Sequence, residues 1–279
     1  MSRVVVVHPG AMGVTVASSF VDAGHDVCWV RDGRSAATVA RAEAAGLAAV
    51  ESLAEACDDA DLVVSVCPPA AAVDVADAVA STRFAGTYLD ANAISPATCE
   101  TVVSRFDGSA VTVVDGSIIG LPAVHAGTTR LYLSGEDDVA TLADQLSGGP
   151  LEVIAIDGGI GAASALKMAF AGWTKGSTAL LLAVAGYADA SGVLDALTAE
   201  WGRSIPGLAD DLARRAGSTA PKAWRFVGEM EEIAASLDSA GLPDGLHTGA
   251  ADLYRRMAGF KDAHTATLDE VLAALRAGR

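Results

Sequence analysis

Residues 8–13, His-Pro-Gly-Ala-Met-Gly, have the length and position of the G-x-G-x-x-G turn that binds the phosphates of a dinucleotide. In that turn the first glycine makes the bend, the second lets the backbone approach the pyrophosphate, and the third lets helix and strand pack closely. Gly10 and Gly13 supply the second and third functions, but His8 stands at the first position. Pro9 fixes its own φ and favours an extended His8, so the bend must form by another route. The residues expected to line the cofactor phosphates are Pro9, Gly10, Ala11, Met12 and Gly13.

The segment 29–35, Trp-Val-Arg-Asp-Gly-Arg-Ser, indicates which dinucleotide binds. NAD-binding folds place Asp or Glu at this position, whereas NADP-binding folds place Arg near the 2′-phosphate. Arg31 and Arg34 offer guanidinium donors, and Ser35 can add a hydroxyl. Asp32 is the contrary observation, because its carboxylate could hold a ribose or cap the next helix. The sequence favours NADPH, with solvated surface arginines as the alternative interpretation.

These residues lie within an alternation of strands and helices. Strands are predicted over 4–7, 26–30, 47–50, 61–66, 86–91, 110–116, 129–135 and 151–156, and helices over 14–23, 36–45 and 52–57. After Gly161 the strand signals stop and helix punctuated by Gly and Pro follows. We therefore predict an α/β Rossmann-type domain over residues 1–158 and an all-α domain with a long central helix over residues 159–279.

Composition excludes several classes of protein. The 279 residues are 51% hydrophobic, enough to fill sizeable cores, and the formal net charge of -16 would repel nucleic acid and anionic membranes. The most apolar stretch, 162–190, is interrupted by two lysines and several glycines, which favours a buried globular helix over a membrane span. Four scattered cysteines predict reduced thiols and no metal site, and no signal peptide precedes the first strand, so we expect a cytoplasmic protein.

Five segments occur in the order of the motifs of the β-hydroxyacid dehydrogenases and 6-phosphogluconate dehydrogenase, a superfamily that also contains the imine reductases. They are residues 8–13, 65–76, 89–98, 114–123 and 159–177. Residues 222–262 also resemble the C-terminal domain of a phosphogluconate-dehydrogenase-like branch, so the resemblance covers nearly the whole chain. It implies a Rossmann-type cofactor domain, a helical domain with one long helix, and a homodimer with its active site in the cleft between domains. An apolar helix that the remaining chain can hardly cover also favours a second copy as partner.

Lys167 occupies the place of the family's catalytic lysine, on the long helix after a glycine pair. Hydride reduction of a carbonyl leaves an alkoxide that must be protonated, and a lysine with a pKa lowered by burial can supply that proton. The alternative is a surface lysine, which its apolar neighbours Leu166, Met168 and Phe170 disfavour.

The chain departs from the family pattern on the helix after Lys167. The resemblance calls for an asparagine four residues later, but Ala171 stands there and cannot hydrogen-bond through its side chain. Thr174 falls within about 20° of Lys167 on a helical wheel, and Lys175 is next to it. We expect Thr174 or Lys175 to supply the missing polar contact to the substrate.

The substrate loop departs as well. Ile119 and Leu121 replace the serine and one glycine of the family's Ser-Gly-Gly, which leaves Gly120, and Ser117 is the nearest hydroxyl. Such a loop favours a substrate with fewer hydroxyl groups than phosphogluconate.

Three weaker candidates remain. Asn92 matches the family loop near the nicotinamide, and Pro68 ends a strand at the edge where ligands bind, but both are also ordinary turn residues. The acids Glu229, Glu231 and Glu232 could bind a cation, but a solvated helix face is the favoured interpretation.

The sequence therefore predicts an NADPH-dependent oxidoreductase acting on a small carbonyl or hydroxy acid, with Lys167 as general acid and base. Two alternatives stay open. An imine reductase shares the fold and the hydride donor, although Lys167 argues against it. A non-catalytic NADPH-binding sensor would account for Ala171 and the altered substrate loop.

Overall fold

A computed structural model of the chain describes residues 1–136, 138–261, 263 and 265–277. The chain forms two compact units, Met1–Met168 and Ala169–Arg279. The division falls inside a 29-residue helix, α7 (Ala162–Ala190). The boundary predicted from the sequence, between residues 158 and 159, lies in the loop just before that helix begins.

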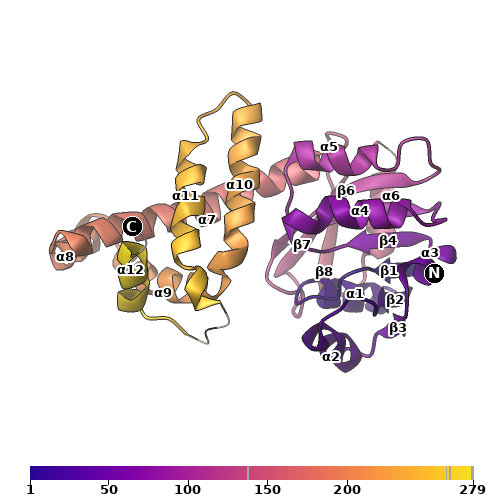
Figure 1. Ribbon diagram of the computed structural model, residues 1–279, viewed down its shortest axis with the longest axis horizontal. Helices are drawn as coiled ribbons and strands as arrows, with labels where there is room; N and C mark the ends of the chain where they lie inside the picture. The colour runs from indigo at the N-terminus through magenta and orange to yellow at the C-terminus, as the bar shows by residue number, and fades with distance from the viewer. Residues whose placement is uncertain (137, 262, 264, 278–279) are drawn as a thin grey trace. The chain divides into compact units, whose positions relative to one another are not determined.

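The first unit is built on an eight-stranded sheet with the order β3-β2-β1-β4-β5-β6-β7-β8 (Figure 1). Strands β1 to β6 are parallel, β7 runs antiparallel to β6, and β8 is parallel to β7. The strands are β1 (Arg3–Val6), β2 (Asp26–Val30), β3 (Ala48–Val50), β4 (Leu62–Ser65), β5 (Thr87–Asp90), β6 (Thr112–Gly120), β7 (Thr129–Ser134) and β8 (Leu151–Ala155). All eight predicted strands are present, and the parallel part has the strand order of a dinucleotide-binding fold. The predicted Rossmann-type class is confirmed.

Helices cover both faces of this sheet, which explains the unbroken valine run of β1. Val4 and Val6 pack in one hydrophobic cluster with α1 (Gly13–Asp22), α2 (Ala36–Ala44) and α6 (Val139–Leu146). Val5 packs in the other cluster with α3 (Leu53–Asp58), α4 (Ala72–Ala80) and α5 (Pro96–Ser104). Alternate residues of a strand point to opposite faces, so a strand covered on both sides contains no polar alternation. The three helices predicted in this region are confirmed to within one residue at each end.

Strand β6 continues past the end of its neighbour β5. Asp90, the last residue of β5, pairs with Asp115, while Gly116–Gly120 pairs with β7. We call Gly116–Gly120 the β6 extension. It projects beyond the carboxyl ends of the parallel strands, the edge at which open α/β sheets bind ligands.

The second unit is helical. Besides the rest of α7 it contains α8 (Leu194–Ser204), α9 (Leu208–Thr219), α10 (Ala223–Ser239), α11 (Gly245–Arg256) and α12 (Leu268–Ala277). Close packing of α11 on α7 requires small residues, because a Cβ atom on Gly176 would lie 3.0 Å from His247 Nε2. The predicted all-α class with a long helix is confirmed. Within the described part of the chain, no helix is both long and apolar enough to cross a membrane.

Candidate cofactor and substrate site

The turn between β1 and α1 bends without its first glycine. The amide of Gly10 donates a hydrogen bond to the carbonyl oxygen of His8 at 2.8 Å, which closes a tight bend around Pro9. A Cβ on Gly13 would lie 2.1 Å from that same oxygen, whereas a Cβ on Gly10 would meet no atom within 4 Å. Gly13 is therefore required for helix–strand packing, and Gly10 faces open space. This fits the approach of a pyrophosphate to the backbone at Gly10.

The other turn residues frame the start of α1. Pro9 is buried, Ala11 is exposed, and Met12 is the N-cap residue of α1. The amides of Val14 and Thr15 donate to the carbonyl oxygens of Gly10 and Met12, and the positive end of the helix dipole attracts anions. The turn and the helix start thus provide a cradle suited to a dinucleotide phosphate.

His8 has an unusual environment that its sequence position did not predict. Burial, and to a lesser extent the nearby charge of Arg34, lowers the pKa of His8 from 6.5 to about 4, so the imidazole is neutral at pH 7. Its Nδ1 atom is buried and has no hydrogen-bond partner among the described residues. The one available signal was the replacement of a glycine in the turn by a side chain that can hydrogen-bond.

The two candidate arginines have different surroundings. Arg31 forms ion pairs with Glu43 and Glu51, and its guanidinium lies 5.8 Å from the centre of the Trp29 ring. Arg34 instead donates through Nε to the backbone oxygen of Asp32 at 3.0 Å and lies close enough to lower the pKa of His8. Of the two arginines, Arg34 is the one whose charge acts on His8 of the turn.

Ser35 and Pro68 have structural roles at helix starts. The Ser35 hydroxyl accepts a hydrogen bond from the amide of Thr38 and caps α2. Pro68 precedes a short 3-10 helix, Pro69–Ala71, after β4. Both are exposed to solvent.

Asn92 is held inside the protein by contacts at each of its amide atoms. Its Nδ2 donates to Ser65 Oγ at 3.0 Å and to Asp90 Oδ2 at 2.9 Å, and its Oδ1 accepts from the amide of Cys67 at 2.6 Å. Burial raises the pKa of Asp90 to about 7, while the bonds from Asn92 oppose this rise. Both amide hydrogens of Asn92 are thus used within the protein, and the contact that Asn92 is predicted to make with the nicotinamide stays a prediction.

Lys167 lies against the β6 extension. Its Nζ atom donates to the carbonyl oxygen of Ile118 at 2.6 Å. The side chain is half-buried, and burial lowers its pKa from 10.5 to about 8. The protonated form therefore predominates at pH 7, and the proton can be lost within the physiological range.

Two other predicted substrate residues lie on the same extension. The hydroxyl of Ser117 is fully buried and has no hydrogen-bond partner in the described part of the chain. Gly120 is exposed and has a φ of +133°, and a Cβ there would lie 2.3 Å from the oxygen of Thr128. Gly120 is therefore required by the β6–β7 hairpin itself. The structure brings Ser117, Gly120 and Lys167 to one short stretch of strand.

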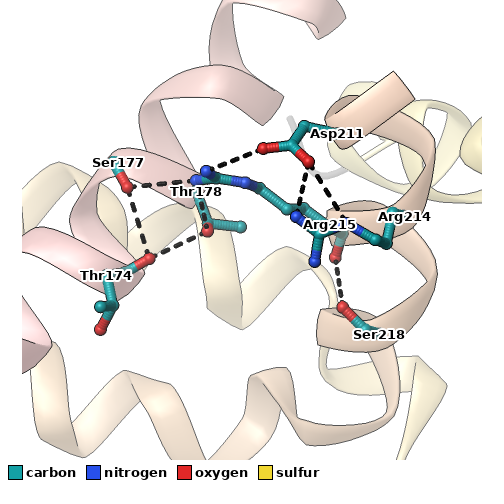
Figure 2. A network of polar contacts seen from close by, with 7 residues as sticks. All are labelled: Thr174, Ser177, Thr178, Asp211, Arg214, Arg215 and Ser218. Atoms are coloured by element: carbon teal, nitrogen blue, oxygen red, sulfur yellow. Dashed lines mark hydrogen bonds and ion pairs between the residues drawn. The ribbon is translucent and has the colours of Figure 1, made fainter. Parts of the chain in front are cut away.

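The remaining candidates, on the α7 segment of the second unit, have partners inside that unit. Ala171 is buried, and the Thr174 hydroxyl donates to the oxygen of Phe170 at 3.0 Å. Figure 2 shows the backbone oxygen of Thr174 beside a polar network in which Arg215 of α9 joins Ser177 and Thr178 to Asp211. This network ties α7 to α9.

Lys175 forms an ion pair with Glu229 of α10, and its ammonium lies 4.4 Å from the centre of the Phe226 ring. The Glu229 side chain is only 13% exposed. Its interpretation as part of a solvated helix face is therefore wrong, because a lysine from another helix neutralises it in the interior. Glu231 does lie on the surface, where it pairs with Arg255.

Two family models match different parts of the chain. Residues 3–90 match the family described as NADP oxidoreductase, coenzyme F420-dependent. Residues 188–257 match a domain of unknown function, DUF1932. The first match covers the turn and β1 to β5, and the second covers α8 to α11.

Individual proteins show the same relationship. An uncharacterised 28.5 kDa protein of Methanothermus fervidus is 30% identical over 165 residues, which are 59% of this chain and 62% of that protein, so the match spans less than two thirds of the relative. The conserved protein MTH1747, of unknown function and described as structurally similar to 3-hydroxyacid dehydrogenases, has a TM-score of 0.68 at 25% identity over 92% of this chain and 97% of its own. The 3-hydroxyisobutyrate dehydrogenase of Mycobacterium tuberculosis has a TM-score of 0.71 at 19% identity over 99% of both chains, a likeness of fold.

These matches confirm the resemblance derived from the sequence motifs. The N-terminal match is to an oxidoreductase family, and the fold is that of the 3-hydroxyacid dehydrogenases. The chain therefore combines an N-terminal segment that matches the NADP oxidoreductase model with a C-terminal segment that matches the DUF1932 model, in a fold similar to that of the 3-hydroxyacid dehydrogenases.

Proposed function

We propose that the protein is a cytoplasmic, homodimeric, NADPH-dependent oxidoreductase that interconverts a small carbonyl compound and the corresponding alcohol or hydroxy acid. The observation that carries the proposal is Lys167 of α7, half-buried against the β6 extension with a pKa lowered to about 8 and its Nζ hydrogen-bonded to the oxygen of Ile118. Lys167 acts as the general acid in reduction and as the general base in oxidation.

The turn residues support the choice of cofactor. Gly10 faces open space where a pyrophosphate would approach, the positive end of the α1 dipole attracts anions, and the charge of Arg34 acts on His8 of the turn. Bound NADPH would supply the hydride. The residues of the turn would hold its phosphates, and Arg34 would bind the 2′-phosphate.

Lys167 completes the reaction by moving one proton. Hydride addition to the carbonyl carbon leaves an alkoxide, and the Lys167 ammonium transfers a proton to that oxygen, which yields the alcohol and a neutral amine. The ammonium has three hydrogens, and Ile118 accepts one of them. The bond to Ile118 thus fixes the direction of the side chain while two hydrogens stay available for the substrate oxygen.

The surroundings of Lys167 favour a substrate with few hydroxyl groups. Ile118 and Ile119 of the β6 extension are buried apolar residues, and Ser117 supplies the one hydroxyl side chain of that stretch. A substrate dense in hydroxyl groups would leave many of its polar atoms without partners there, at a cost of about 1–3 kcal/mol each.

The test compares Lys167→Ala with Lys222→Ala, a control at an exposed lysine of the second unit. NADPH oxidation is measured with aldehydes, keto acids and cyclic imines. We expect Lys167→Ala to slow carbonyl reduction by roughly 10²- to 10⁴-fold and to leave NADPH affinity unchanged. Reduction by the unmodified protein should fall as the pH rises above about 8, because the acid form of Lys167 is lost, and the variant should lack this alkaline limb.

Other outcomes lead to different functions. If Lys167→Ala reduces carbonyl compounds at the original rate, the dehydrogenase assignment is wrong. Preferred turnover of cyclic imines by both proteins would then favour the imine reductase. Tight NADPH binding without turnover of any compound would favour the sensor.

A further inference from the structure

Four polar residues lie side by side across four neighbouring strands. Ser65 of β4 pairs with Asp90 of β5, Asp90 pairs with Asp115 of β6, and Asp115 pairs with Ser134 of β7. We call these four residues the polar row. Each is fully buried, and residues that pair directly point to the same face of the sheet. Burying a carboxylate costs free energy unless the carboxylate is hydrogen-bonded. The hydrogen-bond partners of each carboxylate therefore show which segment of the chain it holds in place.

The contacts of Asp115 lead to the start of α7. Its Oδ2 accepts from the amide of Ser164 at 2.9 Å and from the Ser134 hydroxyl at 3.1 Å, and its Oδ1 accepts from the Ser164 hydroxyl at 2.7 Å. The Ser134 hydroxyl also accepts from the amide of Ala163 at 2.9 Å. Both amides belong to the first turn of α7, whose N–H groups have no acceptor within the helix. Asp115 and Ser134 therefore cap α7 from the sheet.

Lys167 lies one helical turn after Ser164, and its partner Ile118 lies three residues after Asp115 on the same strand. The two contacts, Asp115 with Ser164 and Ile118 with Lys167, thus join the same strand to the same helix one turn apart. The first contact sets where the α7 backbone begins, and this decides whether the lysine side chain can reach the Ile118 oxygen.

We propose that Asp115 is a positioning residue for Lys167: by capping the first turn of α7 on β6, it holds the Lys167 ammonium against Ile118 in a half-buried place. The kinetic consequence rests on the proposed function, whereas the placement of Lys167 does not.

Asp115 acts through placement of the backbone and not through its charge. Burial is the cause of the lowered pKa of Lys167, and the cap is what keeps Lys167 buried. An asparagine at 115 can keep the acceptor for the Ser164 amide and donate to the Ser164 hydroxyl, whereas an alanine can do neither. Comparing the two substitutions therefore separates the effect of the hydrogen bonds of Asp115 from the effect of its charge.

The first experiment measures the pKa of Lys167 directly. The folded protein is labelled with acetic anhydride at a series of pH values, and the peptide that contains Lys167 is quantified by mass spectrometry. We expect a value near 8 in the unmodified protein and a rise toward 10.5 in Asp115→Ala, because the released side chain returns to water. Asp115→Asn should stay close to the unmodified value.

A matched pair of serine variants tests the same contact with a milder change. Ser164 and Ser19 are both fully buried helix residues of the first unit, but the Ser19 hydroxyl bonds to the oxygen of Thr15 within its own helix. Ser164→Ala should raise the pKa of Lys167 by less than Asp115→Ala, and Ser19→Ala should not change it. If Asp115→Ala does not fold, Ser164→Ala decides, and an unchanged pKa there overturns the proposal.

The proposal is also overturned if folded Asp115→Ala keeps the Lys167 pKa near 8. It is overturned as well if Asp115→Asn raises the Lys167 pKa as much as Asp115→Ala does. Kinetic measurements then distinguish the positioning role of Asp115 from the proposed function. The alkaline limb of carbonyl reduction should move upward together with the labelled pKa, with NADPH affinity unchanged. A labelled pKa that shifts in a protein without any alkaline limb would support the positioning role and contradict the proposed function.

Discussion

At the scale of single residues, Arg31 and Arg34 look equivalent in the sequence but not in the fold. Arg31 would have to leave Glu43 and Glu51 to reach a phosphate, whereas the charge of Arg34 already acts on His8 of the turn. We predict that Arg34→Gln weakens NADPH binding by about 1.5–3 kcal/mol, the loss of one charge-assisted contact. Arg31→Gln should have a smaller effect. Titration calorimetry with NADPH and NADH checks this, and equal losses for both cofactors in Arg34→Gln would contradict the role in 2′-phosphate binding.

The two glycines of the turn give a second prediction at this scale. Gly13→Ala places a methyl group 2.1 Å from the His8 oxygen, so the helix must move and the free energy of unfolding should fall by about 1–3 kcal/mol or more. Gly10→Ala meets open space and should fold with unchanged stability. Its methyl group would nevertheless occupy the approach of the pyrophosphate, so NADPH binding should weaken strongly. Denaturant titration and calorimetry together separate the two effects; undiminished cofactor binding by Gly10→Ala would show that the phosphates bind elsewhere.

At the scale of the element, α7 exposes large apolar side chains at a regular spacing. Phe170, Trp173, Leu180, Val184 and Tyr187 are all exposed, and their intervals of three, seven, four and three residues are those of a heptad seam. A helix with such a stripe can pair with a second copy of itself about a two-fold axis. We expect the α7 stripe to form the interface of the homodimer that the sequence predicts.

The corresponding prediction concerns assembly. Leu180→Glu combined with Val184→Glu should convert a dimer into a monomer, because two like charges would face each other across the seam. Leu242→Glu changes another exposed leucine away from α7 and serves as the control. Light scattering at micromolar concentration measures the mass. A monomeric unmodified protein, or a double variant that still dimerises, would show that the stripe is not the interface.

At the scale of the whole molecule, the sequence was sufficient for the two-part architecture and for all eight strands. Hydrophobic patterning reports burial, and burial on both faces explains the apolar runs of residues 4–6 in β1 and 62–64 in β4. The reversal of β7 was not predicted, because patterning is the same in either direction. A signal did exist, since the eight residues between β6 and β7 are too few for the crossover that a parallel pair needs.

The candidate site shows where reasoning from sequence ends. The turn and Lys167 could be identified because their neighbours in the chain carry the pattern. The partners of Lys175 and Arg31 could not, since Glu229 is 54 residues away from Lys175 and Glu43 lies on another element from Arg31. The contacts of Asp115 with Ser134 and Ser164 could not be predicted either. The pairing of β6 with β7 and the start of α7 bring these residues together, although they are far apart in the sequence.

The polar row also discriminates against misfolded sheets. A strand that slips by one residue turns every side chain to the opposite face. For β5 or β6 such a slip would carry Asp90 or Asp115 from its hydrogen-bonded place into the apolar cluster of α1 and α6, and would leave a carboxylate there without a partner. The apolar runs of these strands penalise a slip only weakly, since both faces are hydrophobic. The two carboxylates that organise the site thus also make a wrongly aligned sheet energetically costly, and substitutions of either one by an apolar residue are expected to lengthen the search for the native pairing during folding.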